Sequence, residues 1–281
     1  MQTLSKTGRN RDCMISLNKT YFKIPAIVFH GIIVVSQSVH RHTNRQHYRP
    51  LFVVVSFLLA FFISPAQEIT IQFHHIANGK PLILSDSNYT NAFGEHYQVS
   101  RLKYYISNAG FAENNENNEN NISLVDAAEN DSIIVHAKPG IYSALYFTLG
   151  VDSALNCSGA QDGALDPLNG MFWTWNSGYI FFKLEGYSSS STADLQRIEH
   201  HVGGYRYPNK VSHNIKLALS KQLEVKKGGK LTVHITLDLD KYWKGVNNIK
   251  IAEQALLMAP GGLAIKAADN FTGMFSITTA Q

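Results

Sequence analysis

From Gln67 onward, the chain alternates hydrophobic and polar residues over short runs that are separated by Gly, Asn, Asp and Pro. A period of two residues is typical of strands with one buried face, and no long stretch has the 3.6-residue period of an amphipathic helix. The pattern predicts strands at 68–73, 101–109, 132–137, 143–149, 179–185, 212–218, 230–239 and about 275–279. Eight or so strands favour a single all-β domain, a β-sandwich or jelly-roll rather than a small barrel.

Two segments interrupt this strand pattern with short helical patterns. They span residues 242–247 and 251–258, and the second ends just before the breaker sequence Pro260-Gly261-Gly262. Residues 112–121 form a low-complexity run of Glu and Asn, which is typical of a disordered surface insertion. We therefore expect an all-β domain with one or two short helices.

The first 66 residues differ from the rest of the chain. Residues 51–63 are almost wholly apolar, three arginines precede them, and Ser64-Pro65-Ala66 follows. This arrangement is typical of a secretory signal peptide cleaved after Ala66, and the apolar run is too short to span a membrane comfortably. The residues before it are too many for an ordinary signal-peptide start, which favours a misplaced translation start. We expect a leader at 1–66 and one exported domain, periplasmic or extracellular, at 67–281, with no membrane span.

Removal of the leader changes the charge of the protein. The leader carries 8 of the 25 Lys and Arg residues and 1 of the 21 acidic residues, which leaves 17 basic and 20 acidic residues. No basic stripe remains to suggest nucleic acid as a partner. Cys157 becomes the one remaining cysteine, so we expect the exported domain to have no internal disulfide and to depend on its core.

The most unusual local feature is the aromatic run from Gly170 to Tyr179, Gly-Met-Phe-Trp-Thr-Trp-Asn-Ser-Gly-Tyr. In an extended strand, Trp173 and Trp175 point to the same face. One interpretation is an aromatic core strand. The other is a platform, on which the flat rings of Trp173, Trp175 and Tyr179 stack against a carbohydrate or peptide in a non-catalytic binding module.

Several segments together carry a resemblance to a known family. They are Leu102-Lys103-Tyr104-Tyr105-Ile106-Ser107-Asn108, Leu149-Gly150-Val151-Asp152-Ser153, Ser158-Gly159-Ala160-Gln161, Gly163-Ala164-Leu165-Asp166-Pro167, Gly170-Met171-Phe172-Trp173-Thr174-Trp175 and His200-His201-Val202-Gly203-Gly204. With these segments the chain resembles the MbnP-like family, exported β-rich proteins related to the copper-binding partner encoded beside methanobactin genes. In several relatives, histidines and a tryptophan oxidised to kynurenine hold copper. The resemblance implies a copper site here and a metal-delivery or oxidising partner protein.

The histidines of the exported domain provide candidate ligands, since copper accepts imidazole, thioether or thiolate donors. Adjacent histidines in a strand point to opposite faces, so His74-His75 and His200-His201 can each offer one ligand inward. Alternation with Ile71 and Phe73 favours His75, although the choice between His74 and His75 is not forced. The remaining four are expected to be exposed or hydrogen-bonded: His96, His136, His213 and His234.

The resemblance selects His201 from the second histidine pair, and Gly203 and Gly204 beside it permit close backbone approach. Many relatives have a histidine where this chain has Cys157. Its thiolate could replace an imidazole at Cu(I), or the cysteine could be a small buried residue.

The carboxylates of the chain suggest two further kinds of site, a calcium site and a catalytic pair. Asp152, Asp162 and Asp166 could provide oxygen ligands for calcium, but their neighbours Gly163 and Pro167 also make them turn signals. Three other carboxylates could be combined into an acid and base pair for glycoside hydrolysis, namely Glu185, Asp194 and Glu199. No motif for a nucleophile or a phosphate-binding loop accompanies them.

The sequence therefore predicts an exported, non-enzymatic metal-binding protein. The metal is expected to be copper, held by His75 and His201 near Trp173 or Trp175, with Cys157 as a further candidate ligand. The alternative is the carbohydrate- or peptide-binding module with an exposed aromatic platform.

Overall fold

The computed structural model describes residues 67–86, 88–111, 121–174 and 177–280. All of these lie in one compact unit, Pro65–Gln281. The predicted leader and signal peptide, most of the Glu/Asn run, and Trp175 lie outside the described residues.

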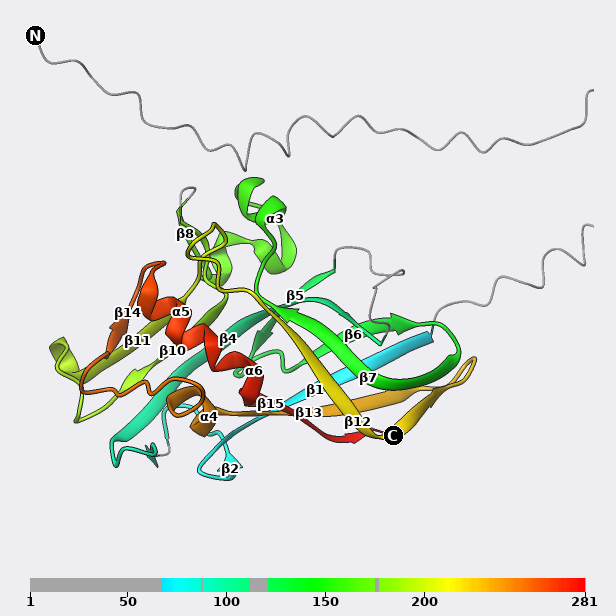
Figure 1. Ribbon diagram of the computed structural model, residues 1–281, viewed down its shortest axis with the longest axis horizontal. Helices are drawn as coiled ribbons and strands as arrows, with labels where there is room; N and C mark the ends of the chain where they lie inside the picture. Colours follow the sequence, from blue (N-terminus) through cyan, green and yellow to red (C-terminus); the bar gives the residue numbers. More distant parts are fainter. Residues whose placement is uncertain (1–66, 87, 112–120, 175–176, 281) are drawn as a thin grey trace, which may run out of the picture. The chain divides into compact units, whose positions relative to one another are not determined.

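The first of the two layers is a five-stranded sheet, called here the β1 sheet (Figure 1). Its strands are ordered β15 (Phe275–Ala280), β13 (Leu231–Asp238), β1 (Gln67–Ala77) and β2 (Lys80–Pro81), and β6 (Ser132–Ala137) also pairs with β1. The β1–β13 pairing is parallel, with Ile71 opposite Val233, whereas the other pairings are antiparallel.

The second layer is an eight-stranded sheet, called here the β4 sheet. Its path runs β12 (His213–Val225), β7 (Gly140–Leu149), β4 (His96–Gly110), β10 (Phe182–Tyr187), β11 (Arg197–Val202) and β14 (Leu256–Leu257). Two short strands, β3 (Tyr89–Thr90) and β5 (Ile122–Asp126), also pair with β4. The two layers confirm an all-β sandwich.

The core lies between the sheets and is built from alternate residues of each strand. Ile69, Ile71 and Phe73 of β1 are fully buried and face aromatic residues of the β4 sheet. The Phe73 ring meets Tyr104 edge-on at 5.8 Å between ring centroids, and Tyr104 meets Phe275 at 5.9 Å. These contacts between the two sheets fix which face of each strand points inward.

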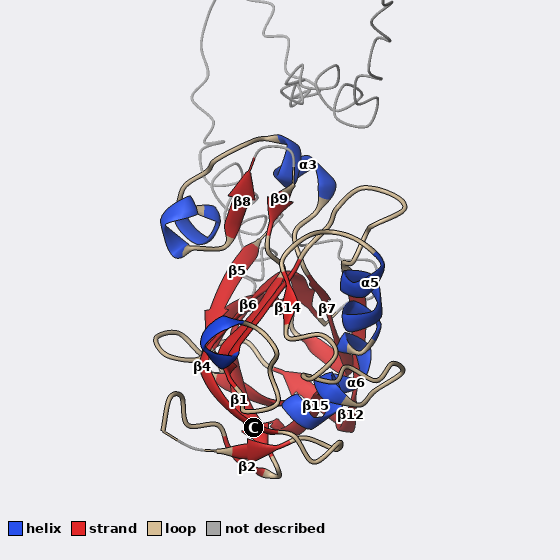
Figure 2. Cartoon of the chain, turned by 90° about the vertical axis from the view of Figure 1, so that its left-hand side faces the viewer, coloured by secondary structure: helices blue, strands red, loops and turns tan. Residues whose placement is uncertain are grey.

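A small group of elements, residues 151–174 and 177–179 and called here the cap, covers one end of the sandwich (Figure 2). It contains α3 (Ser153–Cys157), two 3₁₀ helices (Gly163–Leu165 and Pro167–Asn169) and the two-stranded β8–β9 pair (Phe172–Thr174 and Gly178–Tyr179). The Tyr105 hydroxyl donates to the Ala164 carbonyl oxygen at 3.0 Å. Because Tyr104 faces the core, the next residue Tyr105 points to the other face of β4, so the cap segment that it contacts lies on the outer side of the β4 sheet.

The helices differ from those expected. The helix predicted at 242–247 begins earlier, as α4 (Leu239–Trp243), because the Asp238 side chain accepts a hydrogen bond from the Asp240 backbone and caps its start. The helix predicted at 251–258 is wrong. That segment makes turns and β14, and the buried Glu95 carboxylate accepts from the backbone N–H groups of Ile251 and Ala252.

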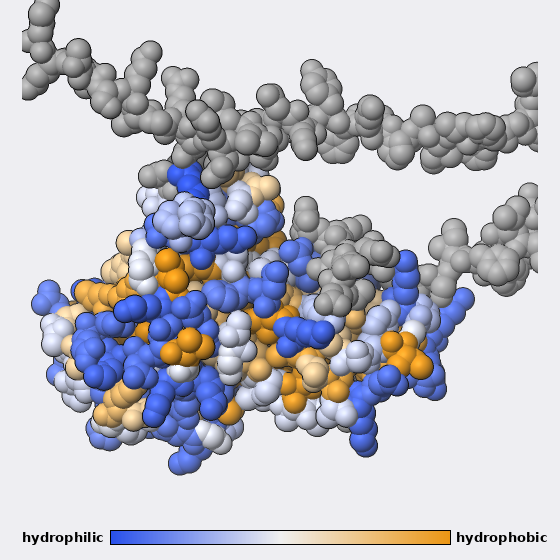
Figure 3. All heavy atoms as spheres, in the orientation of Figure 1, coloured by the Kyte–Doolittle hydropathy of each residue, from blue (hydrophilic) through white to orange (hydrophobic). Residues whose placement is uncertain are grey.

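The remaining helices follow the Pro-Gly-Gly sequence. They are α5 (Gly262–Asp269) and α6 (Phe271–Met274), and a 3₁₀ helix (Asp194–Gln196) precedes β11. No helix among the described residues is long and apolar enough to cross a membrane. The face drawn in Figure 3 shows separate groups of hydrophobic residues among hydrophilic ones.

Candidate metal site

His201 lies on the outer face of the β4 sheet, on the same side as the cap. Within β11, Ile198, His200 and Val202 point into the core and are fully buried, so alternation places His201 on the other face. Its side chain is about 10% exposed. The structure therefore confirms that the adjacent histidines point to opposite faces.

The imidazole of His201 is oriented by a carboxylate. Its Nε2 lies 2.8 Å from Oε1 of Glu185 on the neighbouring strand β10. The pKa of Glu185 is lowered to about 2, first by this hydrogen bond and then by the nearby charges of Lys183 and Arg101. An ionised carboxylate only accepts hydrogen bonds, so Nε2 of His201 carries the proton. In a neutral imidazole, the lone pair is then on Nδ1.

Further charged side chains surround this pair. Lys183 lies 3.5 Å from Glu185 Oε1 and donates to the Gly170 carbonyl oxygen of the cap. Burial lowers the pKa of Lys183. Lys103 pairs with Asp126 at 2.7 Å on the same face of the sheet. The sequence offered one signal for this cluster, the alternation of charged and apolar residues in β10.

Trp173 reaches the same region from the cap. A Cβ added to Gly203 would lie 2.8 Å from Cζ3 of Trp173 and 2.6 Å from the Tyr179 carbonyl oxygen. Only glycine therefore permits this approach of the ring to the chain. Gly203 is two residues after His201, and alternation puts both on the outer face. The indole nitrogen of Trp173 is buried and has no hydrogen-bond partner in the described part of the structure.

The predicted site and the predicted aromatic platform include three more residues of this part of the chain, Trp175, Cys157 and Tyr179. Trp175 lies outside the described residues. Cys157 is the last residue of α3, in the cap. Tyr179 is fully buried, and its hydroxyl donates to the Leu165 carbonyl oxygen at 2.8 Å. Tyr179 is thus a structural residue of the cap and is unavailable as part of an exposed aromatic platform.

His75 lies in the core, on the face that the alternation with Ile71 and Phe73 predicts. Its Nε2 is 3.0 Å from the hydroxyl of Tyr104, and the two rings meet edge-on. Burial lowers the pKa of His75 to about 4, which leaves its imidazole neutral at physiological pH. A neutral imidazole is the form that binds metal.

The structure does not bring His75 and His201 together. His75 contacts Tyr104, whose β10 neighbour Phe182 faces the core, whereas His201 lies beside Lys183 and Glu185 on the opposite face. The β4 sheet therefore separates the two predicted ligands. Sequence alternation placed His75 inward correctly, but it could not show that His201 faces outward, because the cap hides that face from solvent.

The neighbouring His200 is a buried, hydrogen-bonded residue of the core. It is fully buried, with Nδ1 at 2.7 Å from the Tyr242 hydroxyl and Nε2 at 2.6 Å from the Gln254 carbonyl oxygen. Burial lowers its pKa to about 4. Both ring nitrogens have partners within the protein, so His200 holds β11 to the segment before β14.

The four remaining predicted histidines are hydrogen-bonded or paired, as expected. His96 contacts Thr90, His136 lies near Glu68, His213 contacts the Val211 carbonyl oxygen, and His234 lies against His74.

The aspartates considered for calcium act in local turns. Asp152 accepts from the Leu155 backbone and caps α3, and Asp166 accepts from the Leu168 backbone. Glu185 pairs with His201 while Glu199 pairs with Arg197. Within the described residues, no group of three or more His, Cys, Asp or Glu side chains gathers in a way that could hold a metal ion.

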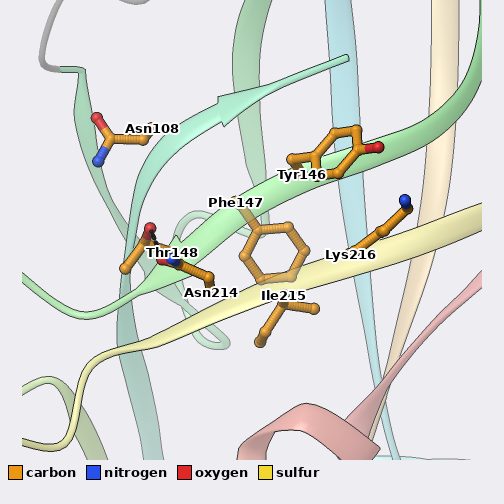
Figure 4. Close-up of a pocket in the computed structure, with 7 residues that line it drawn as sticks. All are labelled: Asn108, Tyr146, Phe147, Thr148, Asn214, Ile215 and Lys216. Atoms are coloured by element: carbon orange, nitrogen blue, oxygen red, sulfur yellow. Dashed lines mark hydrogen bonds between the residues drawn. The ribbon is translucent and has the colours of Figure 1, made fainter. Parts of the chain in front are cut away.

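A surface hollow of about 420 Å³ lies away from this region, between β4, β7 and β12 (Figure 4). Its lining consists of Asn108, Tyr146, Phe147, Thr148, Asn214, Ile215 and Lys216. The Lys216 ammonium lies 5.2 Å from the centre of the Tyr146 ring. None of the predicted site residues lines this hollow.

Two side chains near the cap bear on the predicted metal site. One imidazole is backed by a carboxylate, the common arrangement behind metal-binding histidines. Beside it, the Trp173 side chain has a buried nitrogen without a partner among the described residues. An indole N–H only donates a hydrogen bond, so the His201 imidazole is the nitrogen ligand that these two side chains offer.

The chain is similar to a protein of known structure and to a known family. The structure is similar to that of MbnP from Methylosinus trichosporium, with a TM-score of 0.46 and 14% identity over 66% of this chain and 80% of that chain. No curated protein matches this chain. The profile of the MbnP family matches residues 66–261, well over half of the sequence. The chain belongs to the MbnP family.

Proposed function

We propose that this protein is an exported copper-binding protein that captures or delivers copper and is not an enzyme. The observation that carries the proposal is the hydrogen bond of 2.8 Å between His201 Nε2 and Glu185 Oε1. It assigns the His201 lone pair to Nδ1 and strengthens that nitrogen as a ligand. Family membership supports a copper-related role.

The position of Trp173 supports the same site. In several relatives, histidines and a tryptophan oxidised to kynurenine hold copper. The resemblance implies a similar site in this chain. Trp173 packs on Gly203, which follows β11 and is two residues after His201, and its indole nitrogen is buried without a partner in the described residues. The site we propose therefore uses His201 directly and Trp173 beside it, with the ionised Glu185 behind the imidazole.

His75 is not part of this site. The β4 sheet lies between His75 and His201, and His75 already contacts the Tyr104 hydroxyl. We therefore replace the sequence-based pair of histidine ligands with His201 alone among the described histidines.

A competition titration with Cu(I) and a coloured chelator tests the proposal. His201→Ala should abolish tight Cu(I) binding. Glu185→Gln should weaken it by about 10- to 100-fold, because the orienting carboxylate is lost. His213→Ala is the matched control, since His213 is a partly buried histidine on the same sheet and should leave affinity unchanged. Unchanged Cu(I) affinity in both test variants would contradict the proposal.

A further inference from the structure

A second pair of histidines lies on the outer face of the β1 sheet. His74 and His234 come from the adjacent parallel strands β1 and β13, where His234 is directly opposite Gln72 and His74 is opposite Thr236. His74 is exposed, and His234 is partly exposed. Nε2 of His74 lies 2.9 Å from Nδ1 of His234, and the rings are stacked with centroids 5.1 Å apart. We propose that this pair is a surface site for a divalent transition metal ion, with Cu(II) bound most tightly.

The spacing of the two nitrogens suits one metal ion. Imidazole nitrogens lie at about 2.0 to 2.1 Å from a bound metal, so two nitrogens at right angles around it are about 2.9 Å apart. The His74 and His234 nitrogens already have this separation. In the metal-free pair, one imidazole donates its proton to the other. When the metal binds, the donating imidazole carries its proton on its other ring nitrogen, so both facing nitrogens offer a lone pair, and water fills the other positions of a tetragonal ion.

The surrounding charge also favours a cation. None of the strands β1, β6, β13 and β15 contains Lys or Arg, and the one lysine of the sheet, Lys80 of β2, is opposite Ala77 at the far end of β1. Acidic residues are present in two of them, Glu68 in β1 and Asp238 in β13. In the register of the sheet, the neighbours of the histidine pair are Gln72 and Thr236, both neutral. No fixed positive charge of these strands therefore opposes a divalent ion.

The two strands hold the histidines rigidly. Their backbones pair over eight consecutive positions, from Ile69 opposite Leu231 to Ile76 opposite Asp238. Core-facing residues of the same strands, such as Ile71 and Ile235, are fully buried. Only the two imidazole rings need to turn to direct both lone pairs at one ion. Metal binding therefore costs little conformational entropy. This site is separate from His201, and its existence does not depend on the proposed function.

Cu(II) binding to the full chain tests the inference. The assay is titration followed by electron paramagnetic resonance, and His201→Ala serves as the background so that the cap site does not contribute. One Cu(II) with two nitrogen ligands is expected. Removing either histidine of the pair leaves a single imidazole and should weaken binding by about 100-fold or more. The control is His136→Ala, an exposed histidine on the same sheet, which should bind as the background does.

The outcomes separate the two proposals. His74→Ala is the main variant because His74 is exposed, and circular dichroism confirms that each variant is folded. Absence of Cu(II) binding in the His201→Ala background would overturn the surface site. Equal weakening by His74→Ala and His136→Ala would also overturn it. In either case, loss of Cu(I) binding by His201→Ala would leave the cap site intact as a proposal.

Discussion

Glu185 should make the protein sensitive to acid. Its side chain is about 18% exposed, and it accepts hydrogen bonds from His201 and Arg101. The pKa of its carboxyl falls from 4.5 to about 2 in the folded protein. Because the folded-state pKa is lowered, the unfolded chain takes up the proton first as the pH falls. The ionised carboxylate therefore stabilises the fold above pH 4.5, and this contribution is lost as the pH approaches 2.

The size of the effect follows from that difference in pKa. It corresponds to about 3 kcal/mol of unfolding free energy at neutral pH, of which about 2 kcal/mol is lost by pH 3. Urea unfolding of the wild type and of Glu185→Gln, at pH 7 and pH 3, measures it. We expect the variant to be less stable at pH 7 by about 3 kcal/mol and the gap to narrow to about 1 kcal/mol at pH 3.

A matched control is available directly across the strand pair. Glu199 is opposite Glu185 in the β10–β11 register and pairs with a half-exposed Arg197. Such surface ion pairs contribute about 0 to 1 kcal/mol, so Glu199→Gln should change stability little at either pH. If the gap between wild type and Glu185→Gln is the same at pH 7 and pH 3, the reasoning about this carboxylate is refuted.

Two further variants test the packing around the site. Gly203→Ala places a Cβ within 2.8 Å of Trp173 and 2.6 Å of the Tyr179 carbonyl oxygen, so it should cost about 1 to 3 kcal/mol in urea unfolding and lower Cu(I) affinity. Gly262→Ala, with no atom within 4 Å of the added Cβ, is its control, and equal losses in both would count against the close approach. His200 is buried and neutral with a pKa of about 4, so wild-type stability should fall by about 3 kcal/mol more than that of His200→Gln between pH 7 and pH 4. Parallel pH profiles would contradict this role.

The strand pattern predicted most of the fold because each strand buries one face. The predicted strand at 132–137 matches β6, and the segments around β1, β4, β7, β12, β13 and β15 were found with shifted ends. The strand β11 was missed because its Arg-Ile-Glu-His-His-Val sequence has few strong strand formers. The helices after Pro260 were missed because tertiary packing of small residues such as Ala264 and Ala267 stabilises them more than their weak periodicity suggests.

The site was harder to predict than the fold. Sequence alternation showed that adjacent histidines point to opposite faces of a strand, and it correctly placed His75 on the same face as Phe73. It could not tell that the cap covers the outer face of the β4 sheet and turns that face into a second buried environment around His201. The contact between Gly203 and Trp173 depends on the same folding of the cap, although the glycines did indicate a close approach.

The most direct test of a copper site at His201 is the metal content of the purified protein. Wild type and His201→Ala are incubated with Cu(I), excess metal is removed with a competing chelator, and copper per chain is measured by elemental mass spectrometry. The account predicts about one copper ion per chain in the wild type and a loss of that ion in the variant. Equal copper content in the two proteins would contradict it, as would a wild type that retains no copper.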